Sequence, residues 1–232
     1  MRSTLINEMK KLNVSFVEMG MQTNEQIYKA VNAFLNHDER LASTVTKSDI
    51  SINNDEISLE KLALRVMALQ QPVANDFREV VTVLKASADL ERIGDHAAGI
   101  ARETVDYEDD YSFKAINKEL EAMTAQVRTM LERVVDAYVR KDVLLAKELA
   151  KDDLEVDKYY MKVRQAIIPV VEKDPDMAKS ASSYLLVTRL LERIGDHIVN
   201  ISEWVVYKET GKIVELNLAK SGRNKNALRS DK

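Results

Sequence analysis

A seven-residue stretch occurs twice, letter for letter, in this chain of 232 residues. The sequence LERIGDH occupies Leu90–His96 and returns at Leu191–His197, 101 positions later. Repetition over such a distance indicates one structural unit present twice. The fold therefore has to arrange two similar units of about 100 residues each in one molecule.

Each copy places a glutamate and an aspartate four positions apart, Glu91 and Asp95 in the first and Glu192 and Asp196 in the second. On a helix, residues at this spacing are neighbours on one face. Like charges there destabilise a helix by a few tenths of a kcal/mol, and the glycine between them costs about 1 kcal/mol more. A cation between the carboxylates, with a second helix packed closely at the glycine, would compensate for both.

Composition favours long helices. Apolar residues make up 45% of the chain and charged residues 31%, with only 6 glycines and 3 prolines. So few helix-breaking residues argue for an all-α fold. Apolar side chains recur in steps of three or four, as on the buried side of a helix. The clearest run comprises Phe113, Ile116, Leu120, Met123, Val127, Met130, Val134 and Ala137.

The helical segments form two groups separated by the acidic stretch 106–112. Short turns force consecutive helices to pack as antiparallel neighbours. We therefore expect two tandem, pseudo-symmetric, antiparallel three-helix bundles, residues 1–109 and 110–212. Residues 213–232 carry more basic than acidic side chains and are expected to form a mobile basic tail.

Several residues predict where the helices begin and end. Asp38 is placed to cap the second helix, and Asp76 to open the third through a capping box. Pro169 is expected to kink or end the fifth helix. Asp174, which a proline follows directly, is expected to start the sixth.

Other classes of protein find little support. The net charge of −4 argues against nucleic-acid binding, which leaves a strongly basic surface. The absence of cysteine excludes disulfides and thiolate chemistry. The N-terminus has no signal-peptide core, and no apolar run approaches the length of a membrane span. We expect a cytoplasmic protein that reaches a membrane only through its partners.

A second acidic stripe is expected on the middle helix of each half. Asp49, Asn53 and Glu56 form it in the first half, and Asp153 and Asp157 in the second. Antiparallel packing brings the start of a middle helix beside the end of the third helix, where the repeated stretch lies. The resulting set of roughly three to five oxygen ligands suits a hard cation such as magnesium, manganese, calcium or iron.

A salt-bridged surface is the alternative interpretation, because Arg92 and Arg193 lie inside the repeats. His96 and His197 directly follow the aspartates and point about 100° away around the helix. They are either donors to the metal ligands or ordinary capping and surface histidines.

The two candidate sites are not equivalent. Asn200 and Glu203 continue the acidic stripe of the second copy, whereas Gly99 and Arg102 occupy the matching positions of the first.

With these motifs in view, the sequence resembles the PhoU family over nearly its whole length. Both LERIGDH copies contain the family's E(D)xxxD signature, and Asp49–Glu56 matches D-x-x-[VI]-N-x-x-E. Residues 71–78 read QPVANDFR where the family has QPxAxDLR, with Phe77 in place of leucine. Ile201–Tyr207 is close to the family's NIAEyviY.

The resemblance implies a six-helix protein that carries multinuclear metal clusters on its signature surfaces. Iron, zinc, manganese or magnesium would be the metal. The implied ligands are Glu91, Asp95, Glu192 and Asp196, joined by Asp49, Asn53, Asp153 and Asp157.

The resemblance also implies a regulator of phosphate uptake and not an enzyme. Its partners would be the ATP-binding subunit of the phosphate ABC transporter and a phosphate-sensing histidine kinase. When phosphate is sufficient, the protein would restrain uptake and silence the starvation response, as a homodimer. Two rival hypotheses are a metal-dependent hydrolase or oxidase, for which only His96 and His197 offer an acid or base, and a purely structural bundle.

Overall fold

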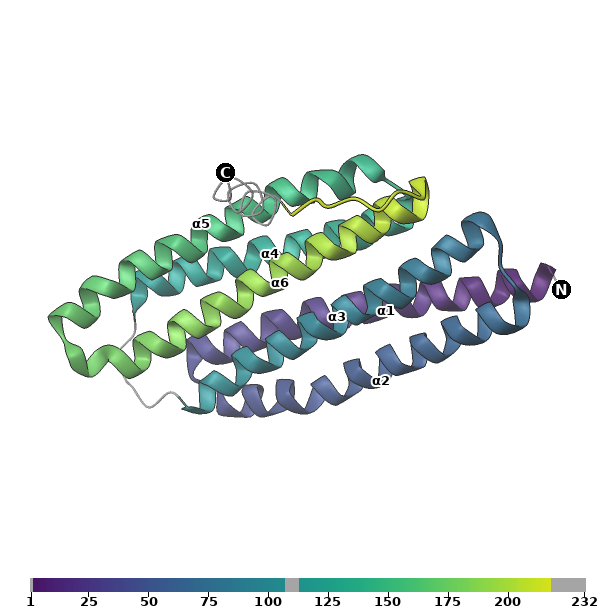
Figure 1. The fold of residues 1–232 in the computed structure, drawn as a ribbon. Helices are drawn as coiled ribbons and strands as arrows, with labels where there is room; N and C mark the ends of the chain where they lie inside the picture. The colour runs from purple at the N-terminus through teal and green to yellow at the C-terminus, as the bar shows by residue number, and fades with distance from the viewer. Residues whose placement is uncertain (1, 107–112, 218–232) are drawn as a thin grey trace, which may run out of the picture.

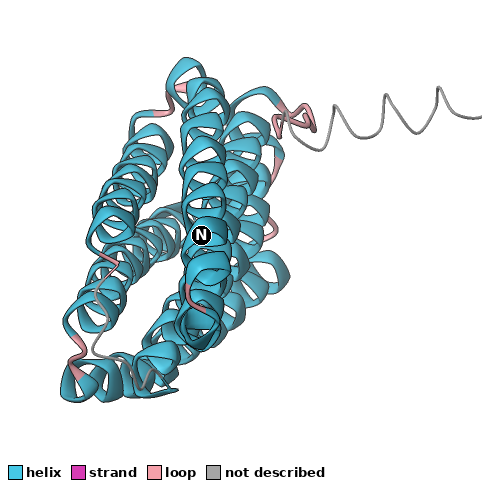
Figure 2. Ribbon diagram, turned by 90° about the vertical axis from the view of Figure 1, so that its left-hand side faces the viewer, coloured by secondary structure: helices cyan, strands magenta, loops and turns pink. Residues whose placement is uncertain are grey.

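The computed structural model describes residues 2–106 and 113–217, which form six α-helices and one short 3₁₀ turn. In these ranges no strand occurs, and helices are joined by short loops (Figure 2). The elements are α1 (Arg2–Asn36), α2 (Glu39–Gln70), α3 (Ala74–Asp106), α4 (Lys114–Arg140), α5 (Val143–Lys173), η1 (Pro175–Met177) and α6 (Ala178–Thr210).

The helices form two antiparallel three-helix bundles that lie side by side. Helices α1, α2 and α3 pack on one another, as do α4, α5 and α6 (Figure 1). The bundles meet mainly where α3 lies against α6, and α1 also contacts α4. The predicted all-α fold of tandem three-helix bundles is confirmed, while the predicted boundary near residue 109 lies outside the described residues.

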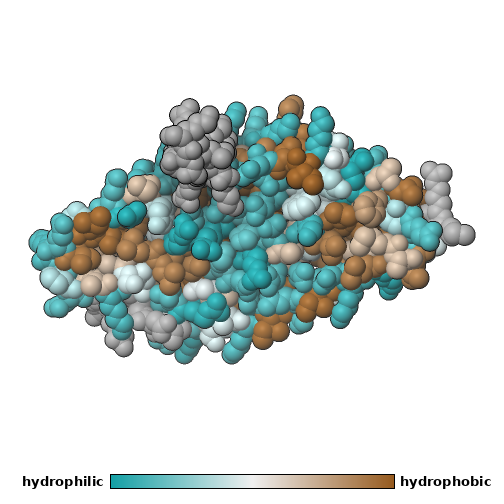
Figure 3. Space-filling view, in the orientation of Figure 1, coloured by the Kyte–Doolittle hydropathy of each residue, from teal (hydrophilic) through white to brown (hydrophobic). Residues whose placement is uncertain are grey.

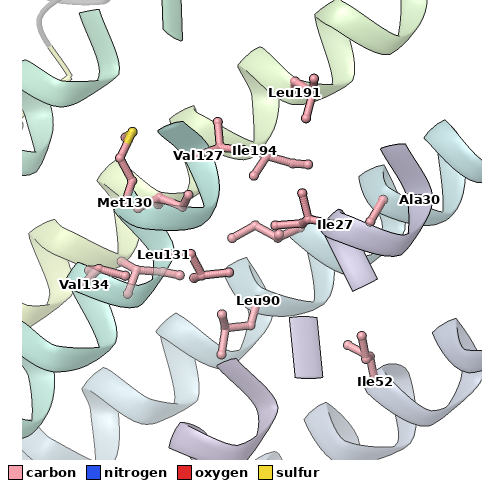
Figure 4. Packing of buried hydrophobic residues seen from close by; sticks show 14 of the residues in the cluster. Ile27, Ala30, Ile52, Leu90, Val127, Met130, Leu131, Val134, Leu191 and Ile194 are labelled. Carbon is pink, nitrogen blue, oxygen red and sulfur yellow. The ribbon is translucent and has the colours of Figure 1, made fainter. Parts of the chain in front are cut away.

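The core runs through both bundles and across their junction. All eight apolar residues of the predicted α4 seam are buried. Between the bundles, Ile27 and Leu90 of the first half lie near Leu131 and Ile194 of the second (Figure 4). Since each such side chain contributes about 1.5–3 kcal/mol when buried, the halves are joined by core packing as well as by a linker.

Aspartate side chains cap the N-termini of α2 and α5. The Asp38 carboxylate accepts a hydrogen bond from the Leu41 backbone N–H at 2.9 Å, as expected for the N-cap of α2. Asp142 caps α5 in the same way. Between helices, Gln71 and Lys141 adopt left-handed backbone angles, with φ of 46° and 60°, and so end α2 and α4.

One boundary prediction needs correction, and one of the two alternatives predicted for Pro169 is excluded. Helix α3 begins at Ala74 rather than Asp76, because the Asp76 N–H already closes a turn onto the Val73 carbonyl at 3.2 Å. Helix α5 does not end at Pro169 but continues to Lys173. Burial of Ile167 just before the proline and packing of Val170 after it outweigh the local cost of about 3 kcal/mol.

The chain turns back after α6. Gly211, with a φ of 71°, ends that helix, and the following segment runs back along α6 (Figure 1). Val214 and Leu216 pack against the core, and Asn217 is only 3% exposed. Residues 213–217, which the sequence assigns to a mobile tail, are therefore held against the second bundle, and residues 218–232 lie outside the described part.

None of the helices in the described ranges combines the length and the apolar character that a bilayer crossing requires. The face drawn in Figure 3 is mostly hydrophilic, with apolar side chains gathered in separate patches.

Candidate functional site

The first repeat brings its carboxylates together with the stripe on α2. We call this group the first acidic face: Asp49, Asn53 and Glu56 of α2 with Glu91 and Asp95 of α3. Burial raises the pKa of Glu91 above its ordinary value, and the nearby charges of Asp95, Glu56 and Asp49 raise it further. The predicted meeting of the middle helix with the signature is thus present in the first half.

Two oxygens of this face are buried without a hydrogen-bond partner, Asp49 Oδ1 and Asn53 Oδ1. Burial raises the pKa of Asp49, and the Asp95 carboxylate adds to the rise. Gln26 and Arg102 act in the opposite direction. Buried oxygens that lack a proton donor are normally rare, and they are the kind of group that a cation satisfies.

The second acidic face comprises Asp153 and Asp157 of α5 with Glu192, Asp196 and Glu203 of α6. Burial raises the pKa of Glu192, and the charges of Asp196 and Asp157 raise it further, against the opposing effect of the arginine at position 189. Glu192 Oε2 is buried without a hydrogen-bond partner. Both repeats therefore hold a carboxylate whose charge is disfavoured by its surroundings.

The glycine of each repeat lies against side chains of a neighbouring helix. A Cβ added at Gly195 would collide with the Asp153 carboxylate, which is itself only 8% exposed as a residue. At Gly94 the added Cβ would lie 3.2 Å from Ile52 Cγ2 and from the side chain of Gln26. The expected close approach of a neighbouring helix at these glycines is present in both halves.

Arginines pair with the signature carboxylates, as the salt-bridge interpretation expects. Arg92 lies 3.0 Å from Asp95 and 3.5 Å from Glu91, but its side chain is 61% exposed. In the second half Arg189, rather than the expected Arg193, donates to Glu192 at 2.6 Å. Exposed pairs of this kind contribute less than about 1 kcal/mol, so they do not lock the carboxylates in place.

Within residues 2–106 and 113–217, no three histidine, aspartate or glutamate side chains are grouped closely enough, as they stand, to hold one metal ion. The faces fit a hard cation in the chemistry of their oxygen donors and in their unpaired buried oxygens. Closure around an ion would require side chains such as Asp95 to turn from arginine to the ion.

The two histidines of the repeats meet each other between the bundles. Their ring centroids are 5.4 Å apart. His197 Nδ1 lies 2.8 Å from an Asp89 carboxylate oxygen, which also accepts a hydrogen bond from Asn200 at 3.1 Å. His96 and His197 therefore lie at the interface between the bundles.

The burial of His96 at the interface between the bundles predicts that the stability of the protein depends on pH. Burial lowers the pKa of His96 to about 4, with the neighbouring His197 as the next cause. Between about pH 6.5 and pH 4 the unfolded chain then binds more protons at this residue, so the free energy of unfolding falls as the pH falls. For this partly buried ring, solvent screening limits the effect to about 1 kcal/mol.

Acidic groups such as Glu91, whose pKa is raised, titrate in the same range with the opposite sign. The contribution of His96 is therefore isolated by comparing the wild type with His96→Gln. We expect the difference between their free energies of unfolding, measured by urea unfolding at several pH values, to change as the pH falls. A difference that stays constant from pH 7 to pH 4.5 would contradict it.

A buried lysine near the other end of α6 escaped the sequence analysis. Lys208 has a side chain only 5% exposed, 3.7 Å from Glu79 of α3. It donates to the Tyr138 carbonyl at 3.2 Å, and its ammonium lies 3.6 Å from the centre of the Tyr138 ring. Asn13 joins these groups, donating to Glu79 at 2.7 Å and accepting from the Tyr138 hydroxyl. The network links four helices of both bundles.

The returning C-terminal segment touches the second acidic face. The side-chain amide of Asn217 donates to Asp196 at 2.6 Å, and the backbone N–H of Leu216 donates to Glu203 at 2.7 Å. Sequence reasoning placed Glu203 in the acidic stripe but gave no sign of these contacts, because they depend on the direction the chain takes after α6.

Known proteins match this chain over most of its length. The model of the PhoU domain family matches twice, at residues 16–104 and 120–205. The phosphate-specific transport system accessory protein PhoU homolog of Clostridium acetobutylicum is 33% identical over 93% of this chain and 99% of its own length.

Two crystal structures have the same fold. The phosphate transport system regulatory protein PhoU from Streptococcus pneumoniae superposes with a TM-score of 0.85 at 31% identity, covering 91% of this chain and 100% of that one. PhoU from Pseudomonas aeruginosa superposes with a TM-score of 0.82 at 31% identity, covering 89% and 99%.

Proposed function

Since this chain belongs to the PhoU family of phosphate transport regulators, we propose that it regulates phosphate uptake as an adaptor. Its partners would be the ATP-binding subunit of a phosphate ABC transporter and a phosphate-sensing histidine kinase. The observation that supports this best is the complete pair of family domains, matched at near full length by regulators of phosphate transport. When phosphate is sufficient, the adaptor would restrain uptake and starvation signalling.

Binding rather than catalysis agrees with where the polar groups lie. General acid–base catalysis requires a titratable group beside the reacting atoms. The histidines that could serve, His96 and His197, face each other between the bundles. The acidic faces lie along the helices and gather carboxylate oxygens, which suits recognition of a cation or of a basic surface.

We further propose that both faces bind hard cations. Glu91 and Asp95, aided by Asp49 and Asn53, would hold the first, and the equivalent residues of the second face would hold the other. A bound cation would offset the repulsion among the carboxylates and fix the helices that carry them. The unpaired buried oxygens and the raised pKa values of the face carboxylates support this assignment.

Elemental analysis of untagged protein, purified without chelator, tests the metal assignment. We expect stoichiometric metal in the wild type and a stepwise loss in Glu91→Ala/Asp95→Ala and in Glu192→Ala/Asp196→Ala. Glu18→Ala/Glu25→Ala removes two exposed carboxylates of α1 and should keep the wild-type content. Folded wild type that contains no metal and takes up no Mn²⁺ would contradict the assignment.

Complementation tests the regulatory role. In a strain that lacks its own PhoU protein, this chain is expected to restore repression of a phosphate-starvation reporter at high phosphate. Binding of the purified transporter subunit should be measured beside it, with Mn²⁺ and with chelator. A well-expressed chain that neither represses the reporter nor binds the subunit would overturn the proposal.

A further inference from the structure

The two acidic faces differ in what covers them. In the first face Asp95 pairs with the exposed side chain of Arg92 at 3.0 Å. In the second face the equivalent Asp196 receives the buried side-chain amide of Asn217. The two residues stand at the same position of an identical repeat, so the repeat itself does not cause the difference.

The cover is the segment Lys212–Asn217, which we call the strap. Gly211 turns the chain through its left-handed backbone conformation, and Val214 and Leu216 pack on the core. The exposed Ile213, at 83%, points away. Apolar side chains thus hold the strap in place, and its polar groups are left to meet the carboxylates of α6.

Polar groups of the strap donate hydrogen bonds to two carboxylates of α6. The Leu216 N–H donates to Glu203 at 2.7 Å and the Asn217 amide to Asp196 at 2.6 Å. Hydrogen bonds to a carboxylate are stronger than those between neutral groups. Each N–H donor occupies one oxygen of a carboxylate on this face, Glu203 Oε1 or Asp196 Oδ1, and so competes with a cation for it.

The chain that follows α3 leads into the second bundle, whereas the chain that follows α6 forms the strap. Helix α3 ends at Asp106, and the chain has entered α4 by Lys114. In addition, the first half has Arg102 at the position equivalent to Glu203. The first face therefore lacks the carboxylate that accepts a hydrogen bond from the Leu216 N–H in the second.

We propose that the strap is an autoinhibitory segment that keeps the second acidic face closed to cations until it lifts. The first face then binds a hard cation readily, and the second binds only when Asp196 and Glu203 release Asn217 and Leu216. This inference rests on the cation binding proposed above. It adds that the two faces have different affinities and that cation binding at one of them moves the C-terminal segment.

Mn²⁺ titration of full-length protein tests the strap. In Glu91→Ala/Asp95→Ala, where the first face is disabled, adding Leu216→Pro and Asn217→Ala removes both donors. We expect Mn²⁺ binding by isothermal titration calorimetry to become about tenfold tighter or more. Ile213→Ala, an exposed change within the strap, should leave the affinity unchanged in the same background.

Hydrogen exchange of the otherwise wild-type chain gives a second measurement. The Leu216 amide should be protected in chelator and should lose protection at Mn²⁺ concentrations that fill the second face. Unchanged Mn²⁺ affinity in the strap variants, or continued protection of Leu216 at saturation, would overturn the strap proposal while normal binding at the first face upheld the proposed function. Absence of Mn²⁺ binding at either face in every variant would overturn both.

Discussion

Replacing Lys208 with alanine is expected to lower the free energy of unfolding by about 3 kcal/mol, because removal of one partner of a buried ion pair leaves the other charge unpaired. Glu79 keeps 18% of its side chain exposed, which places the expected loss at the lower end of the range for such changes. Tyr138 loses the ammonium from its ring face and its carbonyl loses a donor. Urea unfolding followed by circular dichroism at pH 7 measures the loss.

Comparison variants separate the charge from the packing. Lys208→Met retains most of the apolar stem, so we expect it to recover part of the loss but not the interaction with Glu79. Lys212→Ala removes an exposed lysine of the strap and should change stability by less than about 0.5 kcal/mol. If Lys208→Ala lost no more stability than Lys212→Ala, the network would have no role in joining the bundles.

Replacing Gly195 with alanine is expected to cost about 2 kcal/mol, although alanine alone favours a helix by about 1 kcal/mol over glycine. The new methyl group would collide with the carboxylate of Asp153, a residue that is 8% exposed. In Gly94→Ala the added methyl group lies no closer than 3.2 Å to its neighbours, the side chains of Gln26 and Ile52. The small cost of this crowding and the gain in helix propensity should therefore nearly cancel in the free energy of unfolding. The two matched substitutions are compared by thermal and urea unfolding.

A double variant identifies the colliding group. Gly195→Ala combined with Asp153→Ala removes the carboxylate that the methyl group meets. The cost of Gly195→Ala measured in the Asp153→Ala background should therefore be close to zero or favourable. An equal cost in both backgrounds would mean that the glycine serves another purpose, such as a backbone requirement of α6.

The fold was largely predictable because its determinants are local. The apolar seam of α4 follows helical spacing without interruption, and every one of its residues is buried. Asp38 caps α2 through its own side chain, which a short pattern reveals. The start of α3 was misplaced at Asp76, whereas at Pro169 tertiary packing outweighs the local tendency to end a helix, so that α5 continues.

The site was predictable in part. Spacing along α2, α3, α5 and α6 correctly indicated that the stripes would face the repeats, because antiparallel bundles have few alternatives. The cation itself stays a prediction. Contacts between distant segments left no pattern to read: Asp89 meets His197 from the other bundle, and Asn217 returns to Asp196 after a turn.

The contact of α3 with α6 has an evolutionary consequence. His96 contacts His197, the residue at the equivalent position of the other half. Asp89 of the first half contacts Asn200 of the second. The residues equivalent to these two, Leu190 and Gly99, also contact each other, with the halves exchanged. A surface that meets its own equivalent is the arrangement of a two-fold symmetric dimer. Fusion of two such units into one polypeptide frees each copy to change alone, which permits one polar and one apolar version of the same contact.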